Sequence, residues 1–350
     1  MPRPPGGPGR EGEGLPRAVR EPKPPWSAVP VEIRAAVERL LGARVARATR
    51  AYGGYAPSAT FRLLLADGRR AFYKGLHPGA NEHMRSALPV EERVYRELGD
   101  RLGGWAPAYL GSVAHEVWPA LLLEDLGPAA VPPWTASAVR DAAEDFARFH
   151  RRNLDASLPA WLSRTDWQQF ADIWSRLRTQ GDGLRSAAAL AGRRADEAEE
   201  WLDVALPVLE AAALRVRDIP PPYTLLHEDT RSDNLRLVGG RLKLFDWNWA
   251  SAGPPEFDAV ALAESVAAEG GPDPEAVIAR YEVVLSLRPE AVAATVAGFA
   301  AYFSAVAWRP PPPGLPRVRA VQRRQLKACL PWAARLLGLP APGWVRAIRD

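Results

Sequence analysis

The sequence predicts an α+β protein of two lobes, in which a small antiparallel β lobe precedes a larger helical lobe. Its 350 residues exceed what one hydrophobic core usually supports, so two units are expected. Short apolar runs separated by turn signals fill residues 44–125, whereas helical periodicity dominates after Trp134. We therefore expect an N-terminal β lobe over residues 31–125 and a helical lobe over residues 126–350.

The N-terminal segment differs in composition from the rest of the chain. Residues 1–30 are rich in Pro, Gly and Arg and lack the apolar stretch of a secretory signal, so they are expected to form a disordered tail. No later run approaches the roughly 18–20 apolar residues that span a bilayer. Cys329 is the only cysteine, which excludes an internal disulfide and fits a reducing compartment. We expect a cytoplasmic protein with no membrane partner.

The charge of the chain is a weak indicator of a partner. The formal net charge is +4 and the pI is near 9.4, but acidic and basic residues alternate, which indicates a mixed solvated surface and no nucleic-acid partner. Among 45 basic residues only four are lysines. A lysine within a strand, such as Lys74, therefore marks a place where a compact point charge is needed.

The β lobe is predicted from turn signals and alternation. The Asp67-Gly68 pair joins two apolar runs as a two-residue hairpin, and a glycine-containing loop precedes the first of these runs. A helix over Pro89–Leu98 places Glu91 on the same face as its apolar residues. The other elements expected in this lobe are a helix over Val31–Leu41 and strands over Arg44–Tyr52, Ala59–Leu65, Arg69–Lys74, Tyr109–Val113 and Val117–Leu123.

The second lobe is predicted to be helical except for one short, polar, strand-like insert at Tyr223–Trp249. The predicted helices span Ala136–Arg152, Trp167–Arg178, Leu184–Val216, Glu256–Glu269, Pro274–Leu287, Pro289–Trp308 and Arg317–Leu337.

Within the insert, Gly239-Gly240 predicts a two-residue hairpin turn. Extending the strand pairing away from the turn brings Asn234 close to Asp246. One amide oxygen and one carboxylate suit Mg²⁺, which usually takes one or two protein side chains together with nucleotide phosphates. The leucine pairs expected on one face of this hairpin are Leu235 with Leu244 and Leu237 with Leu242.

Asp229 lies five residues before Asn234, on the loop that leads into the hairpin. A carboxylate at that place can accept the proton of a substrate hydroxyl or orient the hydroxyl, as phosphoryl transfer requires. Asp229 is therefore the candidate catalytic residue.

Three segments together resemble a known family. His227-Glu228-Asp229 followed by Asn234 is similar to the His-Gly-Asp-x-x-x-x-Asn loop of aminoglycoside phosphotransferases and choline-kinase-like enzymes. Phe245-Asp246-Trp247 resembles their Ile-Asp-Trp metal motif, and residues 253–258 resemble the Gly-Asp-Pro-x-x-Asp segment that follows it. The resemblance implies a bilobal protein-kinase-like fold.

For the catalytic side, the resemblance implies that Asp229 is the base and that Asn234 and Asp246 hold Mg²⁺. His227 would support the loop, and Asp258 would brace the helix that follows.

For the nucleotide side, the resemblance implies that ATP binds between the lobes. Lys74 would contact its α- and β-phosphates, with Glu91 as the helix partner of Lys74 and Glu92 as the rival for that role. The hinge at Leu121–Asp125 would meet the adenine. The other residues assigned to the nucleotide are Gly53, Gly54 and Ser58 in the glycine loop and Leu123 and Asp125 in the hinge.

The chain departs from the family pattern at several positions. Glu228 replaces the usual Gly, and Pro254 replaces the Asp of Gly-Asp-Pro. Asp233 is either a further metal ligand or a partner of Arg231. The glycine loop lacks a full G-x-G-x-x-G motif.

We expect an ATP-dependent phosphotransferase that moves the γ-phosphoryl group to a hydroxyl of an aminoglycoside-, choline- or sugar-like small molecule. The alternative is a catalytically degraded member that only binds a nucleotide or metabolite. A nucleic-acid-binding protein with a basic tail is the remaining rival. The acceptor, the choice between ATP and GTP, and the choice between monomer and homodimer stay open.

Overall fold

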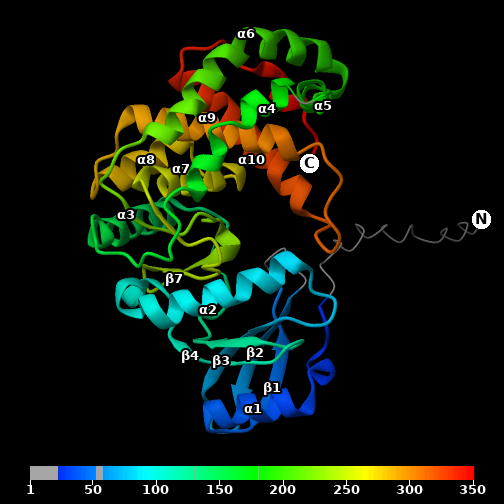
Figure 1. The fold of residues 1–350 in the computed structure, drawn as a ribbon, viewed down its shortest axis with the longest axis vertical. Helices are drawn as coiled ribbons and strands as arrows, with labels where there is room; N and C mark the ends of the chain where they lie inside the picture. The colour runs from blue at the N-terminus through cyan, green and yellow to red at the C-terminus, as the bar shows by residue number, and fades with distance from the viewer. Residues whose placement is uncertain (1–22, 53–57, 130, 180) are drawn as a thin grey trace, which may run out of the picture.

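The structure, a computed structural model, describes residues 23–52, 58–129, 131–179 and 181–350. It has the two lobes that the sequence predicts: an antiparallel sheet with two helices forms the N-terminal lobe, and the remainder is mostly helical (Figure 1). The predicted α+β bilobal fold is thus confirmed.

The N-terminal lobe is built on a five-stranded antiparallel sheet in the order β1-β2-β3-β5-β4. Helix α1, Val31–Leu41, buries Ile33, Val37 and Leu41 in the cluster of apolar side chains that fills one face of the sheet. It ends at Gly42, whose positive φ of 68° allows a left-handed cap. The strands span Val45–Arg50 (β1), Ala59–Leu65 (β2), Arg70–Gly75 (β3), Tyr109–Val113 (β4) and Ala120–Leu123 (β5).

Residues 23–30, which the composition placed in the tail, pack against this lobe. The ring of Trp26 meets the rings of Phe61 and Tyr73 edge-on at 5.1 and 5.3 Å, and Val29 is buried. The ammonium group of Lys23 donates to Thr60 Oγ1 at 2.7 Å. The packed part of the chain therefore begins before residue 30. The ring of Trp26 can hold this segment in place because an aromatic ring buries a large apolar surface.

Helix α2, Glu82–Leu102, covers the other face of the sheet and begins earlier than the predicted helix at Pro89. Asn81 caps it by accepting the amide N–H of Met84 at 2.9 Å. Its buried side chains belong to a cluster that continues through β5 into the helical lobe, so the two lobes share one hydrophobic core on this side.

The helical lobe follows the predicted order with two predicted helices divided. The helix predicted at Trp167–Arg178 is a 3-10 helix, Asp166–Phe170, followed by α4. Residues 184–216 form two α-helices, α5 and α6, separated by a short 3-10 helix at Gly192, which has a φ of 58°. The α-helices span Ala136–Asn153 (α3), Ile173–Thr179 (α4), Gly183–Ala189 (α5), Ala195–Leu214 (α6), Pro255–Ala268 (α7), Pro274–Glu282 (α8), Pro289–Val306 (α9) and Val318–Leu336 (α10). The 3-10 helices span Trp26–Ala28, Gly103–Trp105, Asp166–Phe170, Gly192–Arg194, Arg215–Asp218, Ser232–Asn234 and Gly343–Ala347.

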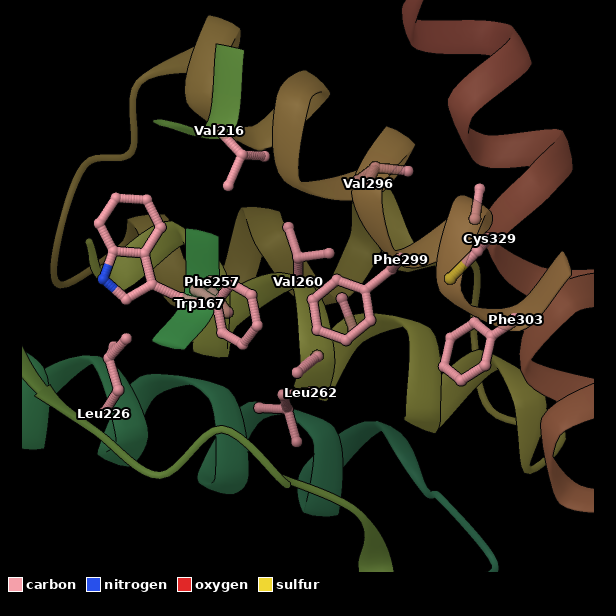
Figure 2. Packing of buried hydrophobic residues seen from close by; sticks show 14 of the residues in the cluster. Trp167, Val216, Leu226, Phe257, Val260, Leu262, Val296, Phe299, Phe303 and Cys329 are labelled. Atoms are coloured by element: carbon pink, nitrogen blue, oxygen red, sulfur yellow. The ribbon is translucent and has the colours of Figure 1, made fainter. Parts of the chain in front are cut away.

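Helices α7 and α9 form the centre of this lobe. Phe257, Val260 and Leu262 of α7 pack with Phe299 and other side chains of α9 (Figure 2). Within the described residues, α9 is long and apolar enough to cross a membrane, but 72% of its 18-residue span is buried inside the protein. An apolar helix that is covered on most sides is what the core of a large lobe requires.

Two short two-stranded pairings position the segments that carry the motif residues. Strand β6, Thr224–Leu226, pairs with β9, Ser251–Gly253. Strands β7, Leu235–Val238, and β8, Arg241–Leu244, form the predicted hairpin with both predicted leucine pairs in register. The amide N–H of Phe245 donates to the carbonyl of Asn234 at 3.0 Å, which continues the ladder toward Asp246. The hairpin prediction is confirmed.

The turn of this hairpin yields a stability prediction. Gly239 and Gly240 have φ values of 59° and 76°, a pair that defines a type I′ turn. Gly239→Val should lower the free energy of unfolding by about 1–2 kcal/mol, because a β-branched residue resists positive φ. Gly239→Asn is the matched control and should stay within about 0.5 kcal/mol of the wild type. Urea unfolding measures both, and equal losses in the two variants would contradict the turn assignment.

Candidate active site

Two cavities meet at the loop between β6 and β7. The larger, of about 1,100 Å³, lies between the lobes and is lined by strands β1–β3, helix α2 and the loop. The smaller, of about 640 Å³, lies within the helical lobe. Four residues line both cavities: Asp229, Arg231, Trp249 and Val318.

Lys74 of β3 joins the two lobes. Its ammonium group pairs with Glu91 of α2 and lies 2.5 Å from Oδ1 of Asp246, which follows β8. Burial alone would lower the pKa of Lys74, but Asp246 and Glu91 outweigh it and raise that pKa. Burial opposes the charge of Asp246, yet the ammonium group of Lys74 holds the pKa of this carboxyl below its usual range.

Glu91 and Glu92 have separate roles in the structure. Glu91 is 1% exposed and, besides pairing with Lys74, accepts the amide N–H of Asp246 at 3.1 Å. Glu92 instead accepts the hydroxyl of Ser112 at 2.7 Å. The pairing left open by the sequence thus falls to Glu91, the residue on the apolar face of α2.

The carboxylate of Asp258, on α7, holds the loop from behind. It accepts the backbone N–H groups of His227 at 2.6 Å and Glu228 at 2.8 Å. His150 of α3 lies 3.2 Å from the same carboxylate. Asp258 and His150 are both completely buried, so this loop is anchored in the core of the helical lobe.

His227 connects the loop to the hairpin. Its Nε2 lies 2.9 Å from the carbonyl of Phe245, and its Nδ1 accepts the amide N–H of Asp229 at 3.3 Å. These two contacts require the proton on Nε2. The imidazole packs edge-on against Trp247 with ring centres 4.6 Å apart. His227 is a buried structural residue here.

Asp229 is held by two side chains that follow it. The amide nitrogen of Asn234 donates to Asp229 Oδ2 at 2.8 Å and to its carbonyl at 2.9 Å. The guanidinium group of Arg231 pairs with Oδ1 of Asp229. Burial raises the pKa of Asp229, although Arg231 opposes that shift. A fixed carboxylate with a raised pKa is suited to accept a proton.

Arg231 is a candidate functional residue that the sequence reasoning treated only as a departure from the motif. Asp233 accepts its Nε at 3.0 Å and its terminal nitrogen at 3.2 Å, which makes Asp233 a partner of Arg231. The signal that could have identified Arg231 is the spacing Asp-x-Arg-x-Asp, which allows one guanidinium group to contact two carboxylates.

The residues available for Mg²⁺ are few. Within the described residues, no group of three or more His, Cys, Asp or Glu could hold a metal ion. Asn234 and Asp246 flank the mouth of the hairpin and both line the larger cavity. Because the side-chain amide nitrogen of Asn234 is hydrogen-bonded to Asp229, the side-chain oxygen of Asn234 is left to bind a cation. This donor set of two oxygens fits Mg²⁺ that is also bound by phosphates.

Only some of the residues predicted to bind the nucleotide line the larger cavity. Ser58, Lys74 and Glu91 line the larger cavity. Gly53 and Gly54 lie outside the described residues. Leu123 and Asp125 are not part of the described cavity walls: Leu123 is buried and pairs with Phe72 and Tyr109, and Asp125 pairs with Arg62 at 3.6 Å. Their assignment to the nucleotide stays a prediction.

The smaller cavity is lined partly by residues that are not among the predicted site residues. Glu228 and Glu264 lie in its wall. The positive φ of Glu228, 65°, explains why a glycine suits this position. The aromatic residues of the wall come from segments far apart in the chain, which no local pattern brings together. They are Phe170, Trp249, Phe299, Tyr302, Phe303 and Trp308.

Several solved structures have a fold similar to that of this chain. Spectinomycin phosphotransferase, in complex with ADP and spectinomycin, is similar with a TM-score of 0.58 and 12% identity over 91% of this chain and 96% of that chain. A choline/ethanolamine kinase family protein from Mesorhizobium loti gives 0.55 and 16%, over 90% and 98%. Choline kinase from Streptococcus pneumoniae gives 0.52 and 12%, over 88% and 98%.

No curated protein matches the chain in sequence. The model of the phosphotransferase enzyme family matches residues 48–282, which include Lys74 and the whole segment from His227 to Asp258. This match spans more than half of the chain, and it confirms the resemblance and the enzyme class that the three motifs indicate. The chain belongs to the phosphotransferase enzyme family.

Proposed function

We propose that this protein transfers the γ-phosphoryl group of ATP to a hydroxyl of a small molecule that binds in the smaller cavity. The observation that carries the proposal is the position of Asp229 and Arg231, which line both cavities. A group that leaves a nucleotide between the lobes must pass these two side chains to reach an acceptor in the helical lobe.

On the acceptor side, Asp229 accepts a hydrogen bond from the acceptor hydroxyl and orients its oxygen toward the γ-phosphorus. The new oxygen–phosphorus bond forms as the bond to the β,γ-bridging oxygen breaks, ADP leaves, and the hydroxyl proton passes to Asp229. Asn234 keeps the Asp229 carboxylate in place, since its amide nitrogen donates to that carboxylate.

On the nucleotide side, Lys74 contacts the phosphates and Glu91 keeps its ammonium group in position. Asn234 and Asp246 would hold Mg²⁺, which neutralises phosphate charge when it is bound. In this proposal, Asp246 gives up part of its contact with Lys74 and binds Mg²⁺ when the nucleotide complex is present.

Asp229→Asn should lower kcat by about 10²–10⁴-fold, because the amide cannot accept the hydroxyl proton. The readout is ADP release in the presence of an alcohol that the wild type phosphorylates, with nucleotide affinity measured in parallel. Retained affinity together with lost turnover is expected. Normal turnover by Asp229→Asn would contradict its role, and a wild type that binds nucleotide but phosphorylates no alcohol would favour the degraded, binding-only alternative.

Lys74→Met should lower kcat/KM for ATP by about 10²–10³-fold, the loss that typically follows removal of one preorganised group that stabilises charge. Lys243→Met is the matched control, because Lys243 is equally exposed at 18% but pairs with Glu124 at 3.8 Å, outside both described cavities. A similar loss in both variants would indicate general damage to the fold.

Glu228 predicts a pH dependence of stability. Burial raises the pKa of this carboxyl to about 8, against hydrogen bonding by Ser251 and with the help of Asp258. Since the folded-state pKa is the higher one, the stabilisation is complete below the unfolded value near 4.5 and is lost as pH rises through about 8. Urea unfolding between these pH values should show this decline in the wild type and a flatter profile in Glu228→Gln. An identical slope in both proteins would contradict it.

A further inference from the structure

The side chains that line the smaller cavity indicate which class of acceptor it binds. This inference rests on the proposed function. Phe170 lies with its ring centre 5.0 Å from that of Phe299 and 5.4 Å from that of Tyr302, so the three rings form one continuous wall. Phe303 extends this wall along the same side of α9 (Figure 2). Trp308 and Trp249 add two further aromatic rings to the lining.

Each carboxyl group in the described lining of this cavity contacts a neighbouring polar or charged side chain. Asp229 pairs with Arg231, and Asp182 pairs with Arg185 at 3.3 Å. Glu228 accepts the hydroxyl of Ser251. Within the described lining, no further Asp or Glu is present except Glu264.

Glu264 is 1% exposed, and its carboxyl accepts the side-chain amide of Gln325 at 2.7 Å. Its second oxygen has no hydrogen bond within the described structure. Burial raises the pKa of Glu264 well above its usual range.

The same wall also carries positive charge. Arg176 and Arg309 line the cavity and both are exposed. The guanidinium group of Arg309 lies 5.4 Å from the ring centre of Trp308. The described lining has four carboxyl groups and three arginines, and each carboxyl group contacts a neighbouring polar side chain, so little negative charge is left to bind several ammonium groups.

We propose that the acceptor is an uncharged alcohol built on one or more rings, which lie against the Phe170–Phe299–Tyr302 wall while its hydroxyl reaches Asp229. A volume of about 640 Å³ is within the range of cavities that enclose such molecules. Amide and hydroxyl groups in the lining, Gln322, Gln325 and Ser186, supply neutral polar contacts. The arginines of the same wall and the contacts already made by its carboxyl groups disfavour a polycationic acceptor.

The test compares two neutral ring-bearing alcohols, naphthylethanol and cyclohexylethanol, with the polycation kanamycin. Calorimetry measures affinity for the full-length protein loaded with Mg·ADP, and ADP release with Mg·ATP measures transfer. We expect the better neutral alcohol to bind at least about tenfold more tightly than kanamycin. Tighter binding of kanamycin, or no binding of either alcohol by nucleotide-loaded protein, overturns the proposal.

Two variants separate the aromatic and the electrostatic parts of the inference. Phe170→Leu, which keeps an apolar side chain, should weaken naphthylethanol binding by about three- to tenfold. Trp161→Phe is its control, because Trp161 stacks on Arg93 at 4.3 Å outside the described lining and should change nothing. An unchanged affinity in Phe170→Leu contradicts the placement of the rings.

Val321→Asp adds a carboxylate to the wall and should shift the affinity ratio toward kanamycin by about three- to tenfold. Val283→Asp is its control, since Val283 is 65% exposed and lies outside the described lining. Absence of a shift in Val321→Asp contradicts the charge argument. Failure of the wild type to bind Mg·ADP would instead overturn the proposed function itself, so the two failures are distinguishable.

Discussion

The ammonium group of Lys74 is in contact with two carboxylates that belong to different lobes. Glu91 comes from the helix that covers the β-sheet, and Asp246 comes from the hairpin of the helical lobe. Two carboxylates this close, of which Glu91 is buried and Asp246 half-buried, would repel each other strongly without a cation between them. Helix α2 lies beside the β7–β8 hairpin (Figure 1), and the same cation bridges the two, next to the larger cavity. A compact ammonium group suits this place better than a planar guanidinium group, because it must approach two carboxylates from different directions.

The second constraint is backbone strain at the catalytic centre. Glu228 and Asp246 have φ values of 65° and 70°, in the left-handed region that residues with side chains rarely adopt. Each costs about 1–2 kcal/mol, and each has its amide N–H bonded to a buried carboxylate: Glu228 to Asp258, and Asp246 to Glu91. Charge-assisted hydrogen bonds of this kind offset the strain. Glu228 follows β6 and lines the smaller cavity, and Asp246 follows β8 and lines the larger one, so each cavity has one strained residue in its wall.

The sequence predicts best where a short-range rule determines the geometry. The Gly239-Gly240 turn sets the hairpin register, and α1 has its predicted bounds because its apolar period ends at a capping glycine. The early start of α2 was missed because Pro89 looked like a first helical residue, whereas the Asn81 cap lies a full two turns earlier. The packing of Trp26 was missed because a composition rich in Pro and Gly says nothing about one aromatic anchor. The aromatic wall of the smaller cavity depends on rings from Phe170 and α9, which only the tertiary fold brings together.

The loop that carries Asp229 separates two environments of different charge. On the nucleotide side, the lining includes basic residues from both lobes, among them Arg50, Lys74 and Arg236, which suit phosphate groups. On the other side, the carboxyl groups contact polar side chains and aromatic rings dominate the lining. The residues that would handle the phosphates and the proton lie on the loop and the hairpin, whereas the residues that would select the acceptor lie on α9, α10 and the 3-10 helix Asp166–Phe170. Changes on α9 and α10 can therefore alter the acceptor without moving Asp229. The side chains that hold its carboxylate, Asn234 and Arg231, belong to the loop itself, and the loop is anchored by Asp258 of α7.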